Sequence, residues 1–197
     1  MKFDFSQPIK LENERVILRP LEQNDFTYLL PFSENEKDLW DFSLTPAAGA
    51  ENLQTYIDTA LTAKEKLQAY TFVVFDKHVH KVAGSTRFYD IQITHNVLSL
   101  GYTWYGTEFQ RTGLNRNCKY LLLSYAFDVL GVDRVEFRAD LRNVKSIQAM
   151  KQIGCTQEGI LRSNCSASYG RRDSIVLSIL KPEWDQKVKT HLQSKLY

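Results

Sequence analysis

The sequence is poor in the features that mark several specialised protein classes. It has no run of about 18 apolar residues, and its first ten residues lack a continuous apolar segment, so neither a transmembrane helix nor a signal peptide is expected. It contains only three cysteines, Cys118, Cys155 and Cys165, and none belongs to a Cys-x-x-Cys pair. This argues against a disulfide framework or a zinc site, and it favours a reducing, cytoplasmic location.

An excess of charge of one sign is also absent. The 25 lysines and arginines nearly balance 23 acidic residues, and the net charge of +2 predicts no nucleic-acid partner. The four histidines have no partner at metal-ligand spacing, so no metal site is expected. What is present, 43% hydrophobic and 24% charged residues, is ordinary for a globular protein. We therefore expect a single domain over residues 1–197.

Strand and helix patterns alternate along the whole chain, without a linker or an internal repeat. β-Branched and aromatic runs predict strands at 15–21, 69–76, 81–90, 97–106 and 133–140 and a last strand at 171–180. Helical spacing of apolar residues or helix-opening chemistry predicts helices at 22–32, 52–67, 114–129, 143–154 and 182–196, the last one polar. Gly101 inside a strand predicts a bulge or a close approach to the backbone.

The stretch EFQRTGLNRNCKYLLLSYAF, residues 108–127, begins a helix in an unusual way. From Leu114 onward, apolar residues recur every three or four positions and predict one buried face. The first turn carries no acid, although its free N–H groups and the helix dipole favour negative charge. Such a start, with Arg116 nearby, suits a phosphate group, and Gly113 removes a Cβ where a ligand approaches. A single glycine before a helix is more often an ordinary loop residue, and neither standard phosphate-binding glycine motif is present.

The order of these motifs resembles that of the acetyl-CoA-dependent N-acetyltransferase (GNAT) superfamily, and within it the ribosomal-protein N-acetyltransferase (RimJ/RimL-like) branch. ENERVILRPLEQNDF resembles the opening strand and helix, SLGYTWYG the splayed central strand, and QRTGLN the pyrophosphate loop. NVKSIQAMKQIGC and EGILRSNCSASYGRRDSIVLSIL resemble the next helix and the final hairpin. The resemblance implies an α/β (α+β) fold with a mixed, mostly antiparallel twisted sheet of about seven strands, splayed at the fourth and flanked by helices.

The resemblance also implies roles for individual residues. The pyrophosphate of acetyl-CoA would lie on the backbone of Gln110, Arg111, Thr112, Gly113, Leu114 and Asn115. Tyr102, Thr103 and Trp104 would line the splayed strand, Asn143 would contact the CoA arm, and Ser146 would lie near the sulfur. The sequence departs from the family pattern at Asn115, which crowds the loop, and at Cys155, where an aromatic residue is usual.

A third departure concerns the leaving thiolate. Many superfamily members have a tyrosine seven residues after the motif asparagine, but Met150 occupies that position here. Ser146 is then the remaining hydrogen-bond donor toward the sulfur and the predicted catalytic residue. The plain alternatives are that Ser146 is only a first-turn residue and that Asn143 is only a helix cap.

The acceptor amine must attack uncharged, and this favours an α-amine. Its pKa of about 7.7 to 8.0 leaves a useful neutral fraction at pH 7, whereas a lysine near about 10.4 is almost wholly protonated. Candidate bases are few, namely Glu108, Asp140 and Glu158. We expect a peptide or protein N-terminus as the acceptor, with Arg162, Arg171 and Arg172 at a rim unfavourable to polycations. A small-molecule amine, or a non-catalytic acyl-CoA-binding domain, is the alternative, in a monomer or homodimer.

Overall fold

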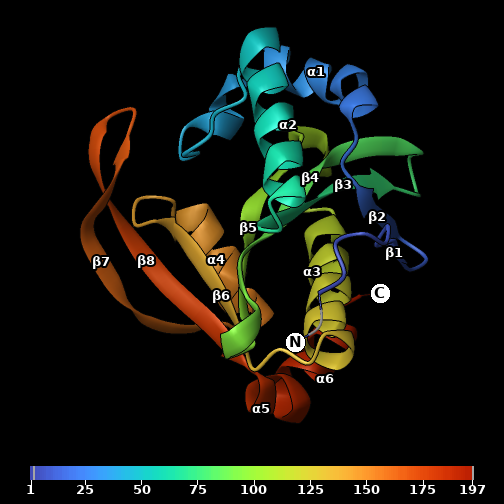
Figure 1. The fold of residues 1–197 in the computed structure, drawn as a ribbon, viewed down its shortest axis with the longest axis vertical. Helices are drawn as coiled ribbons and strands as arrows, with labels where there is room; N and C mark the ends of the chain where they lie inside the picture. Colours follow the sequence, from blue (N-terminus) through green and yellow to red (C-terminus); the bar gives the residue numbers. More distant parts are fainter. Residues whose placement is uncertain (2, 197) are drawn as a thin grey trace.

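The computed structural model describes residue 1 and residues 3–196, and its centre is one twisted eight-stranded sheet (Figure 1). The strand order is β1-β2-β3-β4-β5-β6-β8-β7, and every neighbouring pair is antiparallel except β5 and β6. The strands are β1 (Leu11–Glu12), β2 (Val16–Pro20), β3 (Ala69–Asp76), β4 (Lys81–Gln92), β5 (Val97–Tyr105), β6 (Arg134–Asp140), β7 (Thr156–Ala167) and β8 (Gly170–Leu180). The mixed, mostly antiparallel sheet is confirmed, with β1 as one strand more than expected.

Helices cover both faces of this sheet. The α-helices are α1 (Phe26–Asn35), α2 (Ala50–Glu65), α3 (Leu114–Ser124), α4 (Val144–Ile153), α5 (Lys181–Glu183) and α6 (Lys189–Gln193). Short helical turns are η1 (Gln23–Asp25), η2 (Lys37–Trp40), η3 (Ile93–His95), η4 (Thr107–Phe109), η5 (Tyr125–Val129) and η6 (Trp184–Val188). Consecutive side chains of β5 point to opposite faces, and Trp104 contacts Tyr56 of α2 whereas Tyr105 contacts Asn115 of α3. Hence α2 and α3 lie on opposite faces.

Two sequence predictions about helices were wrong in detail. Val129 was expected on the buried face of α3 but is 69% exposed, because the helix widens at η5, where the Leu130 N–H donates to the Tyr125 carbonyl five residues earlier. The C-terminal helix was expected to be polar, yet Trp184, Val188 and Leu192 are buried. Their four-residue spacing gives the helix one narrow apolar stripe, which its many polar residues conceal in the sequence.

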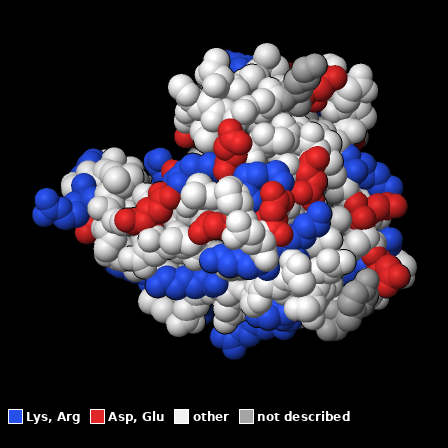
Figure 2. All heavy atoms as spheres, turned by 90° about the horizontal axis from the view of Figure 1, so that it is seen from below, with Lys and Arg blue, Asp and Glu red and all other residues white. Residues whose placement is uncertain are grey.

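The outer surface carries mixed charge. The face in Figure 2 shows basic and acidic side chains interspersed over the molecule, in keeping with 25 basic and 23 acidic residues. The β7–β8 hairpin projects from the body beyond α4 (Figure 1). Within the described part of the chain, no helix combines the length and apolar character needed to cross a bilayer.

Candidate active site

The parallel strands β5 and β6 separate after a short pairing, and this gap defines the candidate site. They pair only over Val97–Ser99 and Arg134–Glu136. Beyond that point β5 follows β4 as far as Tyr105, while β6 follows β8 as far as Asp140. The edge of β5 that faces β6 therefore carries backbone groups without a strand partner, at the carboxyl ends of two parallel strands. Such a switch point is where open α/β sheets bind ligands.

A β-bulge lies in β5 at the point where the strands have separated. Ser85 of β4 pairs with Trp104, and Arg87 pairs with Gly101, so Tyr102 and Thr103 together oppose the single residue Thr86. The backbone at Tyr102 is left-handed, with φ of 49°. The bulge predicted beside Gly101 is thus confirmed. It redirects the backbone groups of Tyr102 and Thr103 relative to those of a regular strand.

The side chains of the bulge belong to two different environments. Trp104 is buried among Phe32, Trp40 and Tyr56 and donates from Nε1 to the Tyr56 hydroxyl at 3.4 Å. The Trp104 side chain is therefore part of the core beside α2, and only its backbone borders the gap.

Thr103 points to the other face of the sheet, where it meets a lysine that the sequence did not single out. The Lys119 ammonium of α3 donates to Thr103 Oγ1 at 2.8 Å, and Thr103 Oγ1 lies 2.8 Å from Thr86 Oγ1. Lys119 is only 5% exposed, and burial lowers its pKa to about 8. Lys119 thus braces the bulge from the α3 side. It was missed because a lysine within a helix ordinarily faces solvent.

The predicted phosphate loop has the geometry of an anion site. Gly113 is left-handed with φ of 88°, Arg111 has φ of 61°, and the first turn of α3 contains no acid and no side-chain cap. Among the described residues, no backbone carbonyl accepts from the N–H groups of Arg111, Thr112 or Gly113. A Cβ on Gly113 would meet only Arg116 Nη2, at 3.7 Å, so the outer side of the glycine is open. These free donors at a helix N-terminus suit a phosphate group.

Neighbouring side chains fix this loop to β5. Gln110 donates from Nε2 to the Tyr105 carbonyl at 3.0 Å, and Thr112 donates to the Phe109 carbonyl at 2.7 Å. The Leu114 N–H donates weakly to Thr112 Oγ1 at 3.4 Å. Asn115 turns inward and accepts from the Tyr105 hydroxyl at 3.1 Å. Its side chain therefore does not crowd the loop, contrary to the expectation from the sequence.

The second helix start, at α4, lies beyond the carboxyl end of β6. Asn143 is the N-cap, its Oδ1 accepting from the Ser146 N–H at 3.0 Å, and Gly154 ends the helix with φ of 109°. Both helix boundaries predicted from the sequence are confirmed. Ser146 is half-buried, and Met150 is buried one turn later on the same face. The capping interpretation of Asn143 holds, while the roles of Asn143 and Ser146 toward acetyl-CoA stay predictions.

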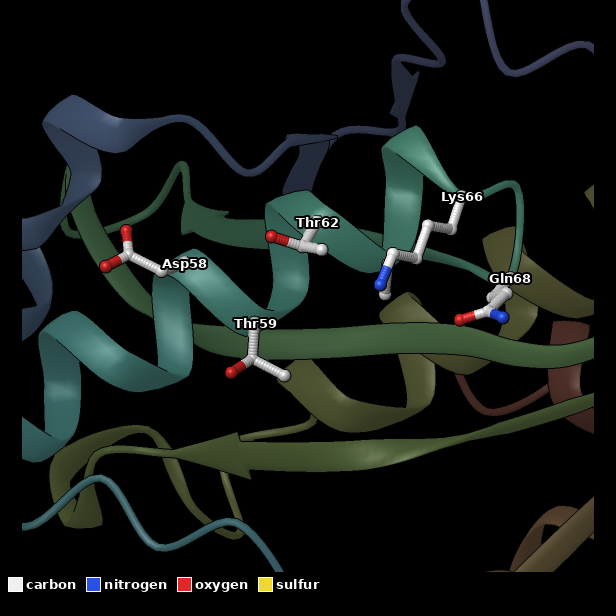
Figure 3. A pocket seen from close by; sticks show the side chains of 6 residues that line it. Asp58, Thr59, Thr62, Lys66 and Gln68 are labelled. Carbon is white, nitrogen blue, oxygen red and sulfur yellow. The ribbon is translucent and has the colours of Figure 1, made fainter.

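A surface hollow of about 480 Å³ links the two helix starts. Gln110 of the phosphate loop and Lys145 of α4 line it together with Thr107 and residues 34–39. A smaller hollow, about 330 Å³, lies along α2 and is lined by Asp58, Thr59, Thr62, Ala63, Lys66 and Gln68 (Figure 3). None of the predicted site residues lines the hollow on α2. The hollow beside Gln110 is therefore the one that we assign to the candidate active site.

The three candidate bases are all engaged elsewhere or solvated. Burial raises the pKa of Asp140, but hydrogen bonds from Tyr169 and Arg142 outweigh it and hold that pKa below its ordinary value. A hydrogen bond from Arg134 lowers the pKa of Glu158 to about 2. Glu108 is exposed and lies 3.7 Å from the Lys81 ammonium. Their lowered pKa values make Asp140 and Glu158 poor proton acceptors near neutral pH.

The closing hairpin returns to the site through its tip. Tyr169 donates to the Asp140 carboxylate at the end of β6, and the Arg142 guanidinium lies 3.2 Å from the centre of the Tyr169 ring. Among the expected rim arginines, Arg171 donates to Ser163 Oγ at 2.9 Å, which braces the hairpin. Arg172 is buried and donates to Ser174 Oγ at 3.0 Å. Only part of the expected arginine rim therefore faces solvent.

Two of the three cysteines, Cys118 and Cys155, are buried. Burial raises the pKa of the Cys118 thiol, and likewise that of Cys155, to about 12. Both thiols are therefore unreactive core groups. Over residue 1 and residues 3–196, no cluster of three or more metal-ligating side chains occurs.

Comparison with known proteins agrees with this geometry. A family model described as the acetyltransferase (GNAT) domain matches residues 15–156. The "Probable N-acetyltransferase YjcK" of Bacillus subtilis (strain 168) is 26% identical over 182 residues, covering 89% of this chain and 99% of that protein. YdaF of the same organism, provisionally named a ribosomal N-acetyltransferase, is 25% identical over 181 residues, covering 88% of this chain and 95% of YdaF. A crystal structure of a GCN5-related N-acetyltransferase from Brucella melitensis superposes with a TM-score of 0.89 at 27% identity, over 97% of this chain and 86% of that one.

Proposed function

Because the chain belongs to the acetyltransferase (GNAT) family, we propose that it transfers an acetyl group from acetyl-CoA to the α-amine of a peptide or protein N-terminus. The observation that carries the proposal is the glycine-opened, acid-free start of α3 beside the unpaired edge of β5. The provisional name of YdaF supports the ribosomal-protein branch, and hence a protein acceptor. A small-molecule amine remains the second candidate, since substrates within one family differ mainly in loops.

Each part of the site has a task in this reaction. The N–H groups of Arg111, Thr112 and Gly113 bind the pyrophosphate. The free backbone edge of β5 pairs with the pantetheine arm, and N–H groups at the bulge point toward the thioester carbonyl. When the amine attacks, that oxygen becomes an oxyanion, and preorganised N–H donors lower the barrier. The bulge, braced by Lys119 through Thr103, keeps these donors in place.

The engaged carboxylates support an α-amine as the acceptor. Asp140 and Glu158 both have lowered pKa values and are weak bases. An acceptor that is already partly neutral at pH 7 needs little help, and an α-amine meets this condition better than a lysine.

A competition among acceptors tests the proposal. One assay contains a peptide with a free N-terminus, the same peptide N-blocked but carrying a lysine, and an aminoglycoside. We expect the free N-terminus to be acetylated at least about tenfold faster, because its amine is neutral more often. Mass spectrometry of the products identifies the acetylated amine. Preferential acetylation of the blocked lysine peptide or the aminoglycoside would contradict the proposal.

Ser146 is proposed to donate a hydrogen bond to the leaving sulfur. Ser146→Ala should lower kcat about ten- to a hundredfold, at or below the lower end for positioned proton transfer, with acetyl-CoA affinity unchanged. Gln148→Ala, on the exposed side of the same helix, is the control and should leave kcat as it is. Single-turnover kinetics isolate the chemical step. An unchanged single-turnover rate for Ser146→Ala would reduce Ser146 to a helix residue.

A further inference from the structure

Arg87 of β4 is a deeply buried cation without an acidic partner. The residue is only 4% exposed, and its Nε and Nη2 atoms are buried with no hydrogen-bond partner among the described residues. Two other buried charges in the sheet region are paired with an opposite charge, Asp25 with Arg19 and Asp76 with Arg15. Leaving charged donors buried and unsatisfied is costly, so a missing partner is implied at Arg87.

The position of Arg87 connects it to the site. It pairs with Gly101 across the sheet, immediately before the bulge at Tyr102 and Thr103. Its guanidinium carbon lies 4.4 Å from the centre of the Tyr102 ring and 5.3 Å from that of the Tyr56 ring. The cation is thus held between α2 and the bulged strand, on the face of the sheet opposite to the phosphate loop of α3. Aromatic faces attract the charge but leave the in-plane N–H donors available.

The two unpartnered nitrogens have a specific geometry. Nε–H and the nearer N–H of Nη2 lie side by side on one edge of the guanidinium plane. A carboxylate presents two oxygens at matching separation, and this fork-to-fork arrangement is the strong, specific mode of arginine–carboxylate recognition. A hydroxyl or a carbonyl would satisfy only one of the two donors.

We propose that Arg87 is the carboxylate-binding group of the acceptor site, so that the preferred acceptor carries a carboxylate on the same residue as its α-amine. This rests on the proposed function, because it assigns the acceptor of that reaction. The bulge at Tyr102 borders the place where the amine attacks, and the Tyr102 ring also contacts the guanidinium. An acceptor residue whose amine lies at the bulge would therefore bring its carboxylate toward Arg87. The carboxylate comes either from an N-terminal acidic side chain or from a free amino acid.

Matched acceptor pairs test the charge requirement without any variant. One pair is a peptide with N-terminal glutamate against the same peptide with glutamine; the other is free alanine against alanine amide, which differ only in the α-carboxylate. For the favoured source we expect kcat/KM to be about ten- to a hundredfold higher for the carboxylate, as for a hydrogen-bonded charged group. Preference within the peptide pair identifies the side chain as the source, and preference confined to the free pair identifies an amino acid. Equal turnover within both pairs overturns the inference.

Variants then assign the preference to Arg87. Arg87→Met keeps the size and removes the buried charge, so it should fold; it should erase the preference while leaving the acetyl-CoA KM unchanged. Arg87→Lys, which keeps the charge but loses the fork, should restore only part of the preference. Arg138→Gln, on an exposed part of β6, is the control and should keep the full preference for the carboxylate-bearing acceptor. A full preference in folded Arg87→Met overturns the inference, and circular dichroism verifies folding.

Failure of the proposed function has a different signature. If acetyl-CoA binds but no amine is acetylated, the transferase proposal fails. The carboxylate site is then tested by calorimetric titration of both acceptor pairs into the CoA-bound protein. Tighter binding of the carboxylate-bearing member of either pair that is lost in Arg87→Met supports the site, and equal binding within both pairs overturns it.

Discussion

Replacing Gly113 with glutamate is expected to abolish acetyl-CoA binding. The residue has φ of 88° at the first position before α3, in a loop whose N–H groups are free and whose first helical turn has no acid. A glutamate side chain there would occupy the open side of the loop and place a negative charge where the phosphates bind. We expect the dissociation constant measured by calorimetry to rise more than about a hundredfold, from steric blocking of the loop and like-charge repulsion combined.

A second glycine separates this effect from backbone strain. Gly131 also has a left-handed backbone, with φ of 69°, and nothing lies within 4 Å of its would-be Cβ. It follows η5, at the opposite end of α3 from the phosphate loop. Gly131→Glu should lose a similar amount of stability, about 1 to 2 kcal/mol, and bind acetyl-CoA normally. Near-equal affinity of folded Gly113→Glu and wild-type protein would refute the phosphate site.

Replacing Gly84 with alanine is expected to destabilise the fold severely. The added Cβ would lie 2.1 Å from the Trp104 carbonyl oxygen and 2.9 Å from the Tyr105 Cα, and φ at Gly84 is 153°. Both obstructing atoms are backbone, so no side-chain rotation relieves the clash; β5 must move away from β4. We expect a loss of about 4 kcal/mol or more in the free energy of unfolding, measured in urea, or failure to fold.

The clash also bears on function, because Trp104 directly follows the bulge. Any folded Gly84→Ala protein should bind acetyl-CoA more weakly, since the displaced strand is the one that borders the gap. Gly159→Ala is the matched control, as it too is a strand glycine at a register shift, but nothing lies within 4 Å of its would-be Cβ. That variant should stay within about 1 kcal/mol of wild type. Wild-type stability of Gly84→Ala would contradict the close strand approach.

The sequence by itself determined the local elements and the helix starts. The period of apolar residues marks β3, β6 and α3, and short-range chemistry marks their ends, as in the Asn143 cap and the Gly154 stop. The bulge beside Gly101 and the acid-free start at Gly113 were also predictable, because each depends on a few neighbouring residues. The resemblance to acetyltransferases then supplied their order in space.

Only the tertiary structure decided which side chains meet across the sheet. Arg87 reads as an ordinary polar residue of a strand, and its burial between Tyr56 and Tyr102 depends on how α2 packs on β4 and β5. Lys119 reads as a solvated helix residue until Thr103 is placed against it. These partners lie far apart in the chain. Neither the period of apolar residues nor a helix cap specifies which surfaces pack against each other. Core packing selects these contacts, and it involves the whole sheet at once.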